Sequence, residues 1–195
     1  IGGLGMKDTM DGFIQSFYEE AIHYQNRINL DGESISNEEA KELSESVQGD
    51  WSAETSVQLG DEPVTLQVCH VTRDHLRFLD EDMKRLILSD EGAYICARIA
   101  RDHGLSVGDQ LTFSPYGSDA SYTVKVQGVV RSLTESILMT DACAEKIGYD
   151  YQINTVYTDA TEIPENGHIL NIQSKQAIMD SFDVFMALMN VMVAL

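Results

Sequence analysis

The run from Cys69 to His75 holds the densest group of side chains whose types could do chemistry: Cys69, His70, Asp74 and His75. Thiolate, imidazole and carboxylate groups bind metal ions, and a thiol beside an imidazole is the arrangement of a nucleophile with its base. If the run is a strand, however, the side chains of Cys69 and His70 point to opposite faces. We therefore interpret this group as the end of a strand that leaves a sheet, and we expect no metal site, cofactor site or catalytic residue here.

Other catalytic motifs are not visible in the sequence. The glycine-rich start, residues 1–6, has no preceding strand and no Lys-Ser/Thr pair, so it does not match a phosphate-binding loop. Cys69, Cys96 and Cys143 show no Cys-x-x-Cys pairing, and we expect buried free thiols. Acidic pairs such as Glu38-Glu39 are most simply solvated faces or helix caps. The chain is therefore expected not to be an enzyme.

The charge of the chain is strongly negative. Thirty-two acidic residues against thirteen Lys and Arg give a net charge of −19. This charge repels phosphate backbones, so nucleic acid is not expected as a partner. Acidity also suits a loop on the outer side of a membrane, because Lys/Arg-rich loops stay in the cytoplasm.

Residues 184–195 form an apolar stretch in which Asn190 is the only polar residue. Twelve residues are too few to cross a bilayer, which takes about 20. We interpret the stretch as the start of a transmembrane helix, and we expect a second such segment before Ile1. A C-terminal helix that belongs to the core is the alternative.

Two amphipathic helices are predicted near the ends of the chain. Residues 8–21 place apolar side chains at helical spacing, and a long helix is expected to begin after Ser174. The second helix carries an apolar seam with heptad spacing. The two seams contain Met10, Phe13, Ile14, Phe17, Tyr18 and Ala21 in the first helix, and Ile178, Phe182, Phe185, Met189 and Met192 in the second.

Between these helices the sequence predicts a mixture of strands and short helices. Alternating apolar residues indicate strands, and capping residues and glycines indicate where the helices begin and end. The expected strands are residues 22–30, 51–59, 64–68, 86–88, 111–113, 122–130, 137–139, 154–157 and 169–172, and the expected helices begin at the Ser36 capping box and end near Gly49, run from 93 to 103 before Gly104, and run from Thr140 to Gly148.

The run from Gly92 to Asp109, which ends Gly-Leu-Ser-Val-Gly-Asp, is similar to a stretch in the outer domain of FtsX/MacB-type ABC transporter permeases. Both ends of the chain also look like the membrane-proximal ends of that domain. The resemblance implies an α+β fold with two lobes. One is a small α/β sandwich-like lobe near the membrane, residues 1–73 with 165–195, and the other is a mostly β inserted lobe, residues 74–164.

The resemblance also implies a function. The domain would lie on the extracytoplasmic side of the cell membrane and couple ATP-driven motion to export of a substrate or to an extracytoplasmic partner. Its partners would be a cytoplasmic ABC ATPase, the membrane through flanking transmembrane helices, and a second copy in the full transporter. No catalytic motif carries over from the family. The mechanical stalk contacts that do carry over are Phe13, Phe17, Phe182, Phe185 and Met189.

Two other classes of protein remain open from the residues. A ligand-binding sensor domain of a membrane receptor is also flanked by transmembrane helices, and a deep apolar pocket with convergent polar groups would favour it. A secreted hydrolase fragment would require a cleft that holds paired carboxylates or a metal.

Overall fold

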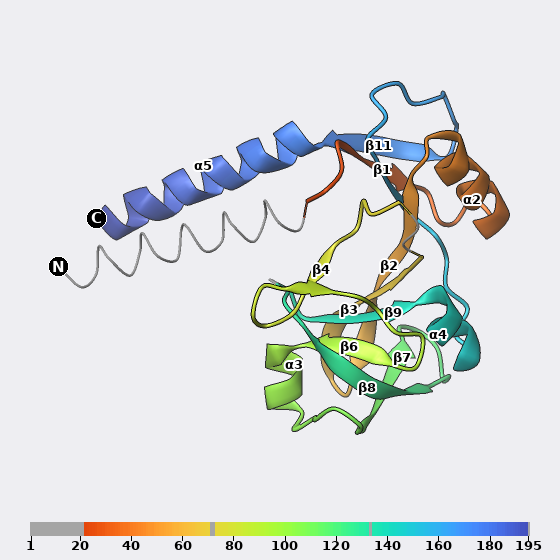
Figure 1. The fold of residues 1–195 in the computed structure, drawn as a ribbon, viewed down its shortest axis with the longest axis vertical. Coiled ribbons are helices and arrows are strands. Elements are labelled where there is room, and N and C mark those ends of the chain that lie inside the picture. Colours follow the sequence, from red (N-terminus) through yellow and green to blue (C-terminus); the bar gives the residue numbers. More distant parts are fainter. Residues whose placement is uncertain (1–21, 71–72, 133, 195) are drawn as a thin grey trace.

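The computed structural model describes residues 22–70, 73–132 and 134–194. Strands dominate the body of the molecule, and one long helix projects from it (Figure 1). The elements are β1 Asn26–Leu30, α2 Asn37–Ser46, β2 Asp50–Leu59, β3 Glu62–Cys69, β4 Phe78–Leu79, β5 Arg85–Leu86, β6 Ala93–Cys96, α3 Ala97–Asp102, β7 Gln110–Pro115, β8 Tyr122–Val130, β9 Ser136–Thr140, α4 Asp141–Lys146, β10 Thr155–Thr158, β11 Ile169–Ser174 and α5 Lys175–Ala194.

Six of the strands form a mixed barrel. Their order is β2-β3-β9-β6-β8-β7, and β7 pairs back onto β2. The β3–β9 and β6–β8 pairs are parallel, and the other pairs are antiparallel. Their apolar side chains form one buried cluster that includes Leu66, Ile95 and Phe113. The fold is therefore α+β, as predicted, and most of its core lies in the barrel.

Three outer strands extend the sheet from β2 in the order β10, β1 and β11. Helix α2 packs against this extension. Leu43 of the helix and Val47, the residue that follows it, join Ile28 and Val156 of the strands in a second apolar cluster. Helix α5 follows β11 directly and points away from the body (Figure 1). The outer strands therefore connect α5 to the barrel.

Most predicted elements are confirmed within the described residues. The Ser36 side chain accepts from Glu39 N, and Ser36 N donates to Glu39 Oε1, which completes the expected capping box. The end of this helix was predicted less well. Gln48, with φ of 52°, takes the left-handed position that we expected of Gly49.

The helix predicted over residues 93–103 is wrong in its first part. Residues 93–96 form β6, a fully buried strand between β8 and β9, and only residues 97–102 are helical. A short apolar run fits a buried strand as well as a buried helix, and pairing on both sides decided between them.

Other predictions are not decided by the described residues. The helix predicted over residues 8–21 lies outside them. The division into a lobe of 1–73 with 165–195 and a lobe of 74–164 is not tested and stays a prediction. Strands of both stretches belong to one sheet. Among the described helices, none combines the length and apolarity needed to cross a bilayer.

Gly104 ends α3 as the sequence predicts. Its φ is 60°, Gly104 N donates to Arg101 O, and Leu105 N donates to Ala100 O at 2.8 Å. These two bonds define a Schellman motif, in which a left-handed residue follows the helix.

We expect Gly104→Ala to destabilise the domain by about 1 kcal/mol, because a Cβ is strained at positive φ. The Cβ itself would meet no atom within 4 Å, so backbone strain is the only cost. Gly167→Ala is the matched control, since Gly167 has equal space and no positive φ. Urea unfolding of both variants tests this, and equal stabilities of the two would contradict the assignment.

Candidate functional site

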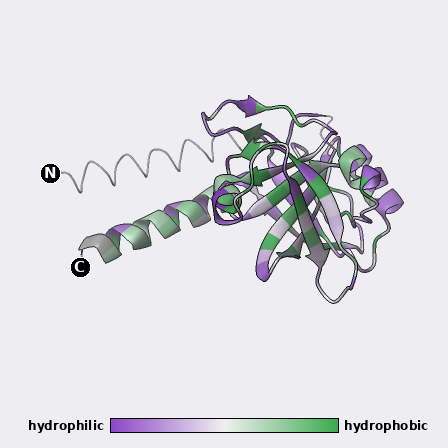
Figure 2. Cartoon of the chain, turned by 90° about the horizontal axis from the view of Figure 1, so that it is seen from below, coloured by the Kyte–Doolittle hydropathy of each residue, from purple (hydrophilic) through white to green (hydrophobic). Residues whose placement is uncertain are grey.

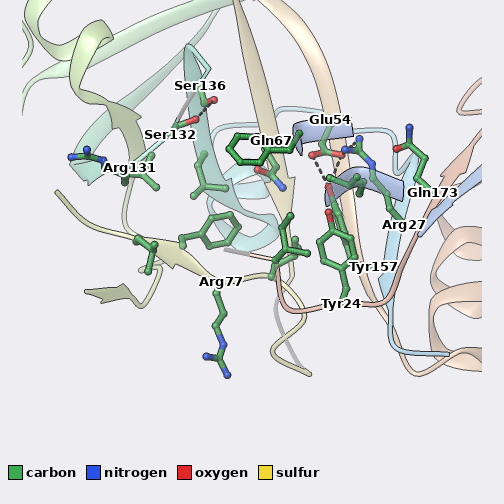
Figure 3. Close-up of a pocket in the computed structure, with 18 of the residues that line it drawn as sticks. Tyr24, Arg27, Glu54, Gln67, Arg77, Arg131, Ser132, Ser136, Tyr157 and Gln173 are labelled. Atoms are coloured by element: carbon green, nitrogen blue, oxygen red, sulfur yellow. Dashed lines mark hydrogen bonds and ion pairs between the residues drawn. The ribbon is translucent and has the colours of Figure 1, made fainter. Parts of the chain in front are cut away.

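A groove lies between the root of α5 and the sheet, with a volume of about 800 Å³. Polar side chains from β1, β2, β3 and β10 line one part of it, and Ser132 and Ser136 line another (Figure 3). Its apolar lining includes Ile22, Leu76, Leu79, Val130, Leu138, Ile178 and Phe182.

Three polar side chains in the groove form a network across three neighbouring strands. Arg27 of β1 donates from Nη2 to Glu54 Oε2 of β2 at 3.0 Å. The Tyr157 hydroxyl of β10 donates to Glu54 Oε1 at 2.9 Å. The Arg27 guanidinium also lies 5.6 Å from the centre of the Tyr157 ring, within reach of a cation–π contact. Dashed lines in Figure 3 mark the bonds that Glu54 forms with Arg27 and Tyr157.

Asn29 extends the network to β11, the strand that carries α5. Arg27 Nε donates to Asn29 Oδ1 at 3.1 Å, and Asn29 Nδ2 donates to Asn171 Oδ1 at 2.7 Å. Asn29 Nδ2 is also 3.4 Å from Gln173 Oε1. Side-chain bonds therefore run without a break from β11 through β1 to β10 and to β2 of the barrel. We call Arg27, Asn29, Glu54, Tyr157 and Asn171 the strand-spanning network.

Burial and neighbouring groups together set the protonation states of Tyr157 and Arg27 in the network. Desolvation of the fully buried Tyr157, together with the Glu54 charge, raises the pKa of the phenol well above 10. Burial opposes the charge of Arg27, but Tyr157, Glu54 and Tyr24 outweigh it, and the pKa of Arg27 is raised. Tyr157 therefore remains a hydrogen-bond donor, and Arg27 remains a cation, across physiological pH.

The predicted stalk residues of α5 fall into two groups. Phe182 is half-buried and lines the groove, and Phe185 reaches its rim, although 54% of its surface is exposed. Met189 lies further along the helix and is 43% exposed. Phe13 and Phe17, their predicted partners, lie outside the described residues.

The Cys69–His75 group does not come together as a site. Cys69 is fully buried at the end of β3, and burial raises the pKa of its thiol. His70 Nδ1 lies 3.0 Å from Asp141 Oδ2, while His75 Nδ1 lies 3.0 Å from Asp50 Oδ2. Within the described part of the chain, no cluster of His, Cys, Asp or Glu could hold a metal ion.

Sequence reasoning missed the strand-spanning network. Arg27, Glu54 and Tyr157 are distant in sequence and belong to no motif. Only the pairing register places Arg27 opposite Tyr157 in the β1–β10 pair and opposite Gln173 in the β1–β11 pair. One weak signal was present. Arg27 is a basic residue next to the apolar Ile28 in a predicted strand, and a base at such a position needs a partner.

No family model matches the chain, and no curated protein matches it. Among solved structures, the fold is similar to the periplasmic region of MacB from Actinobacillus actinomycetemcomitans, with a TM-score of 0.47 and 11% sequence identity. The match covers 85% of this chain and 95% of that chain. It is a similarity of fold alone.

The three cysteines should resist a thiol reagent such as dithiobisnitrobenzoate in the native protein, because their exposed fractions are 0%, 3% and 2%. All three should react after denaturation. Rapid labelling of Cys69 in the native state would contradict a purely structural role.

Glu54→Ala should destabilise the domain by about 2 kcal/mol, because it removes the acceptor of the Tyr157 hydroxyl and the partner of Arg27. Glu62→Ala is the control, since Glu62 is half-exposed and lies 3.4 Å from His103. We expect its effect to stay within about 0.5 kcal/mol. Equal losses of unfolding free energy for the two variants in chemical denaturation would mean that the network does not stabilise the packing of these strands.

Proposed function

We propose that this chain is the extracytoplasmic domain of an ABC transporter permease and that α5 is the lever through which ATP-driven motion reaches it. The observation that carries the proposal is the mounting of α5. Its root is fixed to the sheet through β11, and its outer part projects from the body and is coloured largely hydrophobic in Figure 2. Val184, Leu188 and Val191 in this part are more than half exposed.

The chain enters and leaves the described body at one place. Gln25, just before β1, accepts a bond from Lys175 N, the first residue of α5, at 2.7 Å. Asn26 of β1 pairs with Ser174 of β11. A domain that receives motion through two neighbouring crossings of a membrane needs both connections on one side, and this pairing supports that arrangement.

Among the described residues, the first turns of α5 make most of its contacts with the body. Ile178 and Met179 contact the apolar cluster that includes Leu76 and Leu138. Beyond them, Val184 and Leu188 are 61% and 60% exposed. A helix held at one end in this way can transmit a tilt or a pull to its root.

The strand-spanning network supports the next step, from the root of α5 to the barrel. Backbone pairing joins β11, β1, β10 and β2, and the network ties the same strands with side-chain bonds. Elements that are cross-linked in two ways move together more readily than strands that are free to shear.

The rest of the proposal follows the resemblance. A membrane-proximal lobe of 1–73 with 165–195 would carry an inserted lobe of 74–164, which would meet the substrate or an outer partner. The ATPase would act from the cytoplasmic side, and two copies would form the transporter. Phe13 and Phe17 would pack against Phe182, Phe185 and Met189 to form the stalk.

The groove favours a second candidate, a ligand-binding sensor domain. Its volume of about 800 Å³ is within the range of small-molecule sites, and polar groups converge on an apolar lining. A sensor would respond to ligand without ATP hydrolysis, so the following experiment separates the two candidates.

The full-length protein can be reconstituted in liposomes with its ATPase. In this system, Phe185→Ala should uncouple motion of the outer domain from ATP hydrolysis. A dye on Ser118→Cys, an exposed residue of the barrel, would report energy transfer to labelled lipid headgroups. The ATP-dependent change in transfer should fall at least about fivefold in the variant, while ATP hydrolysis continues.

Tyr116→Ala is the matched control, because Tyr116 is similarly exposed at 51% but lies on the barrel. It should leave the ATP-dependent change intact. Phe185→Ala should cost the isolated domain less than about 0.5 kcal/mol, since the side chain is more than half exposed. A signal that is unchanged in Phe185→Ala, or lost equally in both variants, would refute the lever.

A further inference from the structure

The charge of the groove beside α5 is opposite in sign to the charge of the chain. Arg27, Arg77 and Arg131 are among the described residues that line it, and Glu54 is the one acid in this described lining. The chain as a whole has thirteen Lys and Arg against thirty-two acids. The lining therefore reverses the charge balance of the sequence.

The ion pairs at the groove do not cancel this positive charge. Arg27 is paired with Glu54, which is itself part of the lining. Arg77 donates to Asp74 Oδ2 at 2.8 Å, and Asp74 also pairs with Arg85. One carboxylate is thus shared by two guanidinium groups, and the two pairs together contain three guanidinium groups and two carboxylates.

The arginines lie around an apolar floor, which includes Leu138 and Phe182 of α5. In Figure 3, Arg131 and Arg27 lie on opposite sides of the drawn lining, and Arg77 lies between them. The Arg27 and Arg77 side chains are 33% and 32% exposed. Their charges therefore lie at the boundary between the apolar floor and water.

We propose that the groove binds an anionic amphiphile, with its apolar chain on the floor and its anionic head group against the arginines. A guanidinium group can bind the oxygens of a carboxylate or phosphate with two parallel hydrogen bonds. Burial of the apolar chain stabilises the complex in proportion to the area removed from water. The volume of about 800 Å³ is sufficient for a small ligand of this kind.

Neutral and cationic amphiphiles fit the lining less well. A neutral amphiphile would gain the burial of its chain but no ion pair with the arginines. A cationic one would be attracted by the net charge of −19 and then repelled at the rim of the groove. A cleft lined by one sign of charge focuses the field within it, so the lining decides which ligand is held.

The inference adds a ligand class to the second candidate function, and it rests on that candidate only in using the same groove. Ile178 and Phe182 of α5 line the groove, so an occupant would contact the root of the helix directly. The lever is not required for binding.

Calorimetric titration of the 195-residue chain with ligands of equal chain length tests the proposal. Decanoate, decanol and decylammonium are compared at neutral pH, below the concentrations at which they form micelles. Decanoate should bind at least about tenfold more tightly than the other two, because a charged hydrogen bond adds to the burial of the same chain. The net charge favours the opposite order, so non-specific adsorption cannot produce this result.

Arg77→Gln should weaken the binding of decanoate at least about fivefold and leave the binding of decanol unchanged. Arg85→Gln is the matched control. It also removes one positive charge and one partner of Asp74, but Arg85 is not part of the groove lining. The control should change the affinity for decanoate less than about twofold, because solvent and salt screen its charge.

Equal binding of the three ligands, tighter binding of decylammonium, or binding of none would overturn the proposal. Equal losses of decanoate affinity in Arg77→Gln and Arg85→Gln would overturn it too. Ligand selectivity is measured on the unaltered chain, so it decides the question even where a variant folds poorly. Selective binding of decanoate with a normal ATP-dependent signal in Phe185→Ala would refute only the lever, and the reverse result would refute only the amphiphile site.

Discussion

The antiparallel pairing of β1 with β11 is the constraint on which the rest of this structure depends. It joins the first described strand of the chain to the last, and it sets the point from which α5 departs. It also brings Asn171 within 2.7 Å of Asn29, which links β11 to Arg27 and so to Glu54. Without this pair, the described contacts that tether α5 to the body would be chiefly those of Ile178 and Met179 with the apolar cluster, and the bond from Lys175 N to Gln25 O.

The groove and the strand-spanning network have complementary mechanical properties. The groove leaves open space beside the root of α5, so the helix can change its angle without compressing a packed core. The network lies on the sheet side of this space and resists sliding between the strands. Under the proposed function, a tilt of the helix would be passed to the strands rather than absorbed by rearrangement of side chains within the body.

Local signals in the sequence were sufficient where one turn of chain decides the structure. The Ser36 capping box and the left-handed Gly104 were predicted because all the interacting groups lie within a few residues. Residues 93–96 were assigned to a helix because their strand partners, β8 and β9, lie further along the chain. The strand-spanning network was missed for the same reason. Arg27, Glu54 and Tyr157 become neighbours only through pairing registers that no local pattern specifies.

The topology also has a consequence for how the domain folds. The barrel can close from strands that lie between residues 50 and 140, but β1 must wait for β11, which is synthesised after all the barrel strands. Contacts between such distant parts of a chain form slowly, because the intervening loop must first lose its conformational freedom. Until β11 arrives, one edge of β1 stays unpaired and open to wrong partners. Pairing of β11 with β1, which anchors α5, is therefore expected to be the late and vulnerable stage in the folding of this domain.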